Sequence, residues 1–187
     1  AKFLLYRPQT LIINNLEFDH ADIYPDLAAI TRQFHQLVRA IPGNGTLIVP
    51  GKDANVDALL KLGCWTPLQR FASSNGTVAD WTAYEDPPGT LSILHQGEEV
   101  GRCDWQLSGA HNAENALAAL LAAASVGVEP AVAIEAIGRF GGVRRRLQRL
   151  GDFNGVQLFD DFAHHPTAIR RTLEAIRRRA DVRRVIA

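Results

Sequence analysis

A histidine and two asparagines precede an alanine- and leucine-rich run, and together they could bind a nucleotide. His111, Asn112 and Asn115 lie three or four residues apart, so on a helix they project from neighbouring positions of its first turn. An asparagine amide offers a donor and an acceptor in one plane, which matches the edge of a purine base. The backbone N–H groups of a first helical turn are also available to a ligand. The alternative is that Asn112 caps the helix and Asn115 is a surface residue.

A second polar cluster follows the β-branched, apolar run 10–14, which is typical of a buried strand. Its charged members are Glu17, Asp19, His20 and Asp22. In open α/β sheets, ligands bind at the carboxyl ends of the strands. Mg²⁺ keeps several waters, so one or two protein ligands and phosphate oxygens would suffice, although imidazole suits Mn²⁺ or Zn²⁺ better. The cluster is a candidate metal site, and a capped, solvated loop is the alternative.

Three arginines, residues 144–146, follow the flexible pair Gly141 and Gly142. Arginine is well shaped to grip phosphate oxygens and to neutralise charge during phosphoryl transfer. Arg146 precedes Leu147 in a predicted strand, so we expect its side chain to have the most fixed direction. A solvated basic loop is the alternative.

Asp160 and Asp161 end a predicted strand, and His164 and His165 start a predicted helix. A carboxylate at such a turn can accept hydrogen bonds from ribose hydroxyls. A hydrolase metal site built from Asp161, His164 and His165 is a competing interpretation, and helix capping by either histidine is a third.

The elements that must position these residues alternate between strand and helix. Apolar spacing and caps predict helices over 26–41 and 53–62, each beside a strand, at 10–14 and 46–49. Such alternation indicates an α/β fold with a mostly parallel sheet and flanking helices. Four short strands, separated by turns such as 73–76, are predicted to form antiparallel hairpins appended to this sheet: 68–72, 79–84, 91–95 and 99–105. Helices are expected next, over 112–126 and 130–139.

The charge distribution changes near Phe140. Residues 1–138 contain 8 basic and 15 acidic side chains, whereas residues 139–187 contain 12 and 5. We therefore predict a central domain over 1–139 and the start of a second α/β domain over 140–187. The latter would hold a hairpin turning at Asn154 and Gly155, a helix over 167–180 and a strand from residue 184. The basic end could bind nucleic acid or a polyphosphate, but a solvated arginine-rich helix face is the simpler interpretation.

Composition excludes several classes of protein. The 187 residues carry no net charge and contain no apolar run of about 18 residues, so a cytoplasmic protein without membrane partners is expected. Cys64 and Cys103 lack CxxC spacing, which argues against a zinc site or a disulfide framework. The chain has no GxxxxGK[ST] loop. We expect it to be a piece of a longer protein whose phosphate cradle lies elsewhere.

Three blocks in this order resemble the Mur ligases, the ATP-dependent amide-forming enzymes of peptidoglycan synthesis. The blocks are residues 14–20, residues 109–117, and residues 141–146 followed by 160–167. The resemblance extends over nearly the whole chain. Residues 15–27 and 160–169 are most similar to the branch that joins UDP-N-acetylmuramate to the tripeptide L-Ala-γ-D-Glu-meso-diaminopimelate in cell-wall recycling. The alternative is the branch whose amine acceptor is L-alanine.

The resemblance implies ATP and Mg²⁺ as cofactors and a role for each block. His20 would be a catalytic residue and a ligand of a second Mg²⁺. Asn112 and Asn115 would hold the nucleotide, with Asn115 at the adenine and His111 beside the base.

The resemblance also implies that the second domain contributes to the site. Arg146 would reach the triphosphate from the hinge as a catalytic and nucleotide-binding residue, and Asp161 would contact the nucleotide. The partners would be UDP-N-acetylmuramate and a peptide or amino-acid acceptor, and not nucleic acid. Because the chain lacks the family's phosphate loop, we expect it to be inactive by itself and to bind ATP weakly.

Two other functions stay open at this stage. One is a non-catalytic nucleotide- or nucleic-acid-binding module, and the other is the metal hydrolase. The ligase interpretation requires His20 and Asn115 to meet at one edge of the sheet. A site with three or four side-chain metal ligands would instead support the hydrolase.

Overall fold

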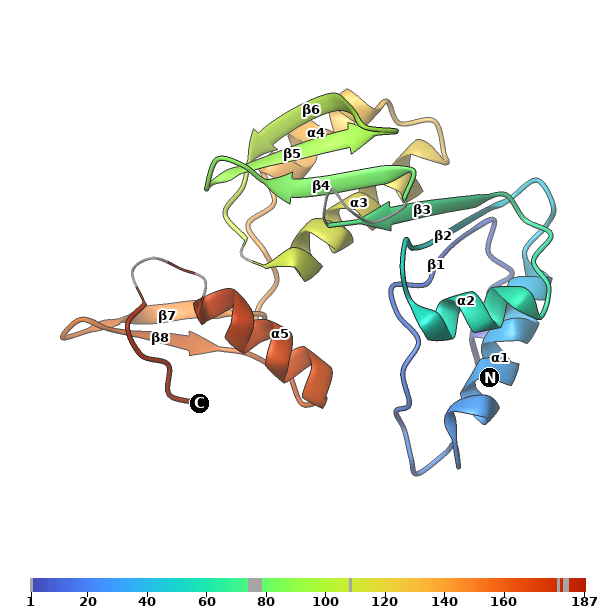
Figure 1. Ribbon diagram of the computed structural model, residues 1–187, viewed down its shortest axis with the longest axis horizontal. Coiled ribbons are helices and arrows are strands. Elements are labelled where there is room, and N and C mark those ends of the chain that lie inside the picture. Colours follow the sequence, from blue (N-terminus) through green and yellow to red (C-terminus); the bar gives the residue numbers. More distant parts are fainter. Residues whose placement is uncertain (1, 74–78, 108, 178, 180–181) are drawn as a thin grey trace.

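The computed structural model describes residues 2–73, 79–107, 109–177, 179 and 182–187. A sheet body contains six strands and four α-helices, and a smaller hairpin body follows it (Figure 1). The sheet body comprises a 3₁₀ turn at Lys2–Leu5, β1 (Thr10–Ile12), α1 (Leu27–Ala40), β2 (Thr46–Pro50), α2 (Ala54–Lys61), β3 (Leu68–Ala72), β4 (Trp81–Glu85), β5 (Thr90–His95), β6 (Glu98–Asp104), α3 (Ala110–Ala124) and α4 (Pro130–Gly138). The hairpin body comprises β7 (Gln148–Phe153), β8 (Val156–Asp160) and α5 (Pro166–Arg177).

The six strands lie in the order in which they occur along the chain. Strands β1 to β4 are parallel, and β5 and β6 complete the sheet through two antiparallel pairings, so that β5 alone among these six strands runs the other way. This arrangement confirms the predicted mostly parallel α/β sheet with flanking helices and antiparallel additions.

The predicted hairpin between 68–72 and 79–84 is wrong, because β3 and β4 run in the same direction. Their pairing is short: among the residues that the structure describes, Phe71 pairs with Trp81 and Ala72 pairs with Thr82. This register places both aromatic side chains in one apolar cluster with α3, which a local turn pattern could not reveal. Residues 74–76 of the expected turn lie outside the described residues.

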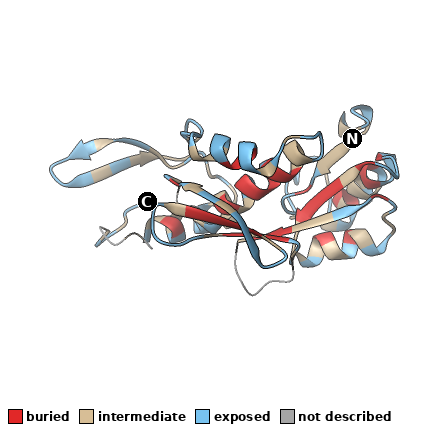
Figure 2. Cartoon of the chain, turned by 90° about the horizontal axis from the view of Figure 1, so that it is seen from above, coloured by how far each residue is buried: buried red, intermediate tan, exposed pale blue. Residues whose placement is uncertain are grey.

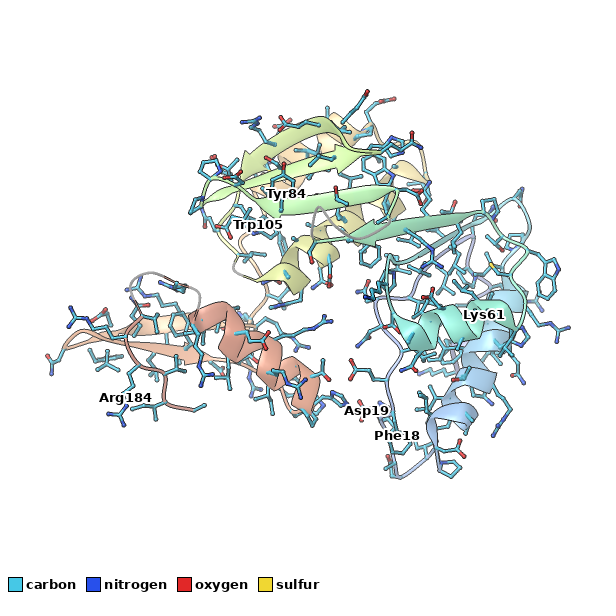
Figure 3. The ribbon with its side chains drawn as sticks, in the orientation of Figure 1. Phe18, Asp19, Lys61, Tyr84, Trp105 and Arg184 are labelled. Atoms are coloured by element: carbon cyan, nitrogen blue, oxygen red, sulfur yellow. The ribbon has the colours of Figure 1, made fainter. Side chains whose placement is uncertain are left out.

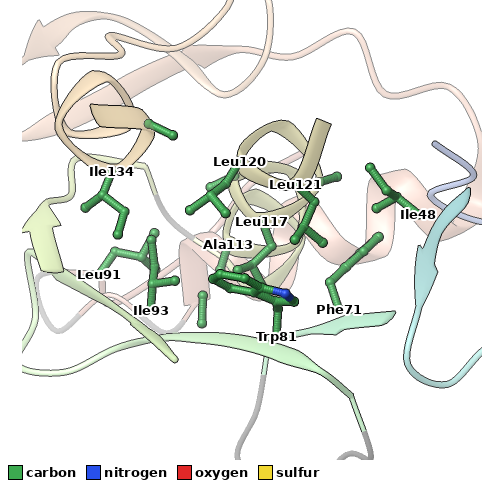
Figure 4. Packing of buried hydrophobic residues seen from close by; sticks show 14 of the residues in the cluster. Ile48, Phe71, Trp81, Leu91, Ile93, Ala113, Leu117, Leu120, Leu121 and Ile134 are labelled. Atoms are coloured by element: carbon green, nitrogen blue, oxygen red, sulfur yellow. The ribbon is translucent and has the colours of Figure 1, made fainter. Parts of the chain in front are cut away.

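The sheet separates two apolar clusters because successive side chains of a strand point to opposite faces. Ile48 of β2 faces a cluster with α3 and α4, whereas its neighbours Leu47 and Val49 face α1 and α2. Figure 4 shows Leu117 and Leu121 of α3 above Trp81 and Phe71. Strand β2 is therefore covered on both sides, as a continuous apolar run predicts.

Short polar caps and small side chains explain where the helices lie. Asp26 accepts a hydrogen bond from the N–H of Ala29 at 2.7 Å and caps α1, and Asp53 caps α2 through the N–H groups of Asn55 and Val56. Both caps follow the sequence prediction. The buried alanines of α3 let its backbone lie close to the sheet.

The hairpin body is more exposed than the sheet body (Figure 2). Asn154 and Gly155 both have positive φ, 53° and 79°, as a type I′ turn requires. The predicted strand start at Leu147 is wrong, because that residue has φ 51° and precedes β7. Residues 184–187 form no strand, since no described strand pairs with them. Ala180, at the end of the predicted helix, lies outside the described residues.

Within the described ranges, the helices are too short or too polar to cross a membrane.

Candidate functional site

The sequence-predicted site residues line one cavity of about 1,410 Å³. The sheet body and the hairpin body both contribute to its wall. The six predicted residues that line it are His20, His111, Asn112, Asn115, Arg146 and Asp161. They come from the loop after β1, the first turns of α3 and the two connections around the β7–β8 hairpin.

The loop between β1 and α1 is tied to the helices on both sides of the sheet. Asn14 donates from its side chain to Oδ1 of Asn115 at 3.3 Å, which links this loop to α3. Asn55 of α2 donates to the carbonyl of Leu16 at 2.7 Å. The carboxyl end of β1 and the beginning of α3 therefore meet, and His20 and Asn115 both line the cavity.

His20 lies on the exposed part of this loop with φ 56°. Its backbone N–H donates to Oδ1 of Asp19 at 2.7 Å, and this hydrogen bond lowers the pKa of the Asp19 carboxyl. Asp19 thus stabilises the left-handed turn that presents the imidazole to the cavity.

The acidic and histidine side chains that line the cavity are spread around its wall. Throughout the described part of the chain, no three His, Cys, Asp or Glu side chains gather closely enough to hold a metal ion. Such a donor set would suit Mg²⁺ held mainly by phosphate oxygens and water; the predicted ligand His20 lines the cavity, although imidazole is not a typical Mg²⁺ ligand. It does not supply the three or four side-chain ligands of the hydrolase interpretation.

The first turn of α3 presents His111, Asn112 and Asn115 together. Gly109, with φ 97°, occupies the cap, so the interpretation of Asn112 as the cap is wrong. Burial lowers the pKa of His111, and the positive charge of Arg171 lowers it further. Both effects favour the neutral form of the ring at the cavity wall.

Arg146 is directed by its neighbours and not by a strand. The N–H of Leu147 donates to Oδ2 of Asp161 at 2.7 Å, and the N–H of Ala163 donates to Oδ1 at 2.8 Å. Asp161 therefore ties the arginine loop to the turn after β8. The Arg146 guanidinium lies 5.7 Å from the centre of the Phe162 ring, a cation–π distance.

Two further contacts join the bodies, and local sequence patterns did not identify them. The hydroxyl of Thr167 donates to Oε2 of Glu17 at 2.7 Å, and Arg171 lies 3.6 Å from Glu114. Glu17 and Thr167 are in recognised blocks, but they are 150 residues apart and no spacing rule pairs them.

His165 directly precedes α5, and its carbonyl accepts a hydrogen bond from the N–H of Ile169 at 3.0 Å, whereas the two imidazoles face away from the helix start. Nδ1 of His164 lies 3.0 Å from the carbonyl of Phe162. The ring of His165 faces Glu17 and the carbonyl of Phe18 on the other body. The imidazole of His165 therefore contributes to the contact between the bodies.

Comparison with known proteins finds two family models on this chain. The Mur ligase middle domain matches residues 2–123, and the Mur ligase glutamate ligase domain matches residues 145–187.

Two relatives of known name show how the similarity is distributed. UDP-N-acetylmuramate--L-alanyl-gamma-D-glutamyl-meso-2,6-diaminoheptandioate ligase of Escherichia coli (strain K12) is 49% identical over 95% of this chain and 38% of its own length. UDP-N-acetylmuramate--L-alanine ligase of Desulfosudis oleivorans is 35% identical over 100% of this chain and 41% of its own length. The chain thus spans about two fifths of the length of the curated relatives that it matches.

The solved structures agree with this assignment. The crystal structure of UDP-N-acetylmuramate:L-alanyl-gamma-D-glutamyl-meso-diaminopimelate ligase from Neisseria meningitides superposes with a TM-score of 0.70 at 44% identity. The match covers 78% of this chain and 44% of the other.

Proposed function

The chain belongs to the Mur ligase family, and from this premise we propose that it is part of an ATP- and Mg²⁺-dependent ligase. The ligase joins the carboxyl group of UDP-N-acetylmuramate to the amine of L-Ala-γ-D-Glu-meso-diaminopimelate. The single observation that carries this proposal is the shared cavity, because residues from both bodies line it together.

Each predicted residue has a place in this proposal. Asn112 and Asn115 hold the nucleotide at the first turn of α3, and the neutral ring of His111 lies beside the base. Arg146 contacts the triphosphate from the opposite wall. Asp161 holds the backbone of the arginine loop through Leu147, so its effect on the nucleotide includes positioning Arg146.

The reaction has two steps. The muramate carboxylate attacks the γ-phosphorus, which forms an acyl phosphate and releases ADP. The acceptor amine then attacks the acyl carbon, forms the amide and expels inorganic phosphate, while the amine loses its proton. Arg146 would stabilise negative charge in the phosphoryl transfer, and Mg²⁺, when bound with His20 as a ligand, would neutralise charge on the phosphates.

The tripeptide is the favoured acceptor because of the difference in identity. The tripeptide ligase of E. coli is 49% identical to this chain, whereas the alanine ligase of D. oleivorans is 35% identical. Residues 15–27 and 160–169 support the same choice.

The test is an acceptor comparison on the complete ligase that carries this chain. With ATP, Mg²⁺ and UDP-N-acetylmuramate, we expect phosphate release and a product of amide mass with the tripeptide, and at least about tenfold lower kcat/KM with L-alanine. Hydroxylamine should trap the acyl phosphate as a hydroxamate. Equal or greater use of L-alanine would reverse the acceptor assignment, and the absence of nucleotide-dependent product with either acceptor would refute the ligase assignment.

A further inference from the structure

Glu17 joins the loop after β1 to the first turn of α5. Its Oε2 accepts a hydrogen bond from the hydroxyl of Thr167 at 2.7 Å. The Glu17 side chain is 30% exposed, so water reaches this contact only in part. A hydrogen bond to a charged acceptor is stronger than a neutral one, and its loss would leave a half-buried carboxylate without this donor.

His165 reinforces the same junction. Its Nδ1 lies 3.6 Å from Oε2 of Glu17, and its Nε2 lies 3.4 Å from the carbonyl oxygen of Phe18. The residue before the α5 helix thus faces both Glu17 and Phe18, and the second residue of that helix contacts Glu17. Figure 3 shows Phe18 and Asp19 on this loop beside the end of α5.

The contact between Glu17 and Thr167 lies between His20 and Arg146, which act on the same phosphate chain in the proposed function. Glu17 is three residues before His20, and Thr167 is six residues after Asp161, which holds the arginine loop through Leu147. The chain passes from the sheet body to the hairpin body through residues 139–147, which include Gly141 and Gly142. The separation of the two bodies across the cavity must therefore be set by non-covalent contacts.

We propose that Glu17 is a positioning residue whose hydrogen bond to Thr167 holds the hairpin body at the separation from the sheet body at which His20 and Arg146 act together. The consequence for turnover rests on the proposed ligase function, but the effect on the separation does not. Glu17 touches no reacting atom in this assignment and acts only through the placement of the other residues.

The first experiment measures the separation directly in the 187-residue chain, without nucleotide. Nitroxide labels are attached through non-natural amino acids at the exposed positions Gln36 and Arg177, so that both cysteines stay in place. Pulsed electron paramagnetic resonance then gives the distance distribution. We expect Glu17→Ala and Thr167→Val each to broaden it and shift it to longer distances, and the double variant to equal either single variant.

Matched variants separate this contact from a general loss of charge. Thr167→Ser keeps the hydroxyl and should retain the wild-type distribution, and Glu17→Gln keeps an acceptor oxygen and should retain most of it. Glu99→Ala removes a carboxylate that pairs with Arg102 at 2.7 Å within the sheet body, so it should leave the distribution unchanged.

The second experiment measures turnover and stability of the complete ligase. A displacement of about 1 Å can reduce a rate by about 100-fold, so we expect Glu17→Ala and Thr167→Val to reduce kcat by about 10- to 100-fold, with little change in Tm. Glu17→Gln and Thr167→Ser should restore most of the rate. A variant that merely unfolded more easily would lower Tm and the active fraction together.

Each result decides one of the two proposals. A wild-type distance distribution in Glu17→Ala would overturn the positioning role, and so would a broadened distribution with unchanged kcat. A wild-type ligase without activity would instead overturn the proposed function, and the distance measurement would still decide whether Glu17 and Thr167 join the bodies.

Discussion

His111 shows how burial can choose the protonation state of a single residue. Its ring lies where α3 meets α5, and burial lowers its pKa below the ordinary value of about 6.5. Arg171 acts in the same direction, while Glu114 and Asp161 oppose the shift. A neutral ring can accept one hydrogen bond and donate another, which suits a group beside a base.

This shift predicts that His111 contributes to a pH-dependent free energy of unfolding. The folded chain disfavours the protonated ring, so the contribution is complete above the unfolded pKa of about 6.5 and declines as the pH falls through that value toward the lower folded pKa. Urea unfolding at a series of pH values from about 8 to 5 would measure it.

The control for this measurement is His111→Gln, which removes the titrating ring and keeps polar atoms. We expect the variant to lose part of the wild-type decline in stability over that pH range. If wild type and variant decline equally, other groups cause the pH dependence, and His111 is not held neutral by burial.

At the scale of elements, Gly109 lies where the start of α3 comes close to α5. Its φ is 97°, and a Cβ atom there would lie 3.0 Å from Cβ of Ala175 and 2.9 Å from the His111 ring. The residue thus needs both a left-handed backbone and the space of a missing side chain.

We predict that Gly109→Ala costs more stability than Gly127→Ala. Gly127 has a similar φ of 90°, but a Cβ there would meet nothing within 4 Å. The Gly127 variant should cost the backbone strain alone, about 1 kcal/mol, and Gly109→Ala should cost about 1–3 kcal/mol more because of overpacking. Urea unfolding of both variants would measure the difference. Equal costs would show that α5 does not restrict this position.

Elements with a local signal were predictable, and contacts between distant segments were not. The caps at Asp26 and Asp53 and the turn at Asn154 follow from side-chain chemistry within a few residues. The parallel direction of β3 and β4 depends on α3, which follows them in the chain. The backbone of Leu147 depends on Asp161, 14 residues later.

The candidate site was predictable for a different reason. Recognised blocks gave the residues but not their partners: the sequence suggested Asp161 as a nucleotide contact, whereas its oxygens hold the N–H groups of Leu147 and Ala163. A sequence block suggests which side chains contribute to the site, and the folded chain shows which of them hold the others in place.

At the scale of the whole molecule, the cavity has walls from two bodies. His20 and Arg146 lie in different bodies and are both exposed. We predict that in the complete ligase His20→Ala and Arg146→Ala each reduce kcat by about 10²–10³-fold, while the free energy of unfolding changes by about 0.5 kcal/mol or less for Arg146→Ala. Steady-state kinetics and urea unfolding would measure both effects.

His20 needs a backbone control because its φ is positive. Asparagine tolerates that conformation better than alanine. We therefore expect His20→Asn to reduce kcat as much as His20→Ala does, and to lower the free energy of unfolding by at most about 1 kcal/mol. Full activity in the His20 and Arg146 variants would show that the site assignment is wrong.

The narrow join between β3 and β4 divides the sheet into two three-stranded plates. Two residue pairs connect them within the described ranges, whereas α3 contacts strands on both sides of the join. The buried side chains of α3 therefore help to hold the two halves of the sheet together, because few backbone hydrogen bonds join β3 to β4. The same helix carries the residues proposed to hold the nucleotide. Nucleotide binding at its first turn would therefore be coupled to how firmly the two halves of the sheet are held together.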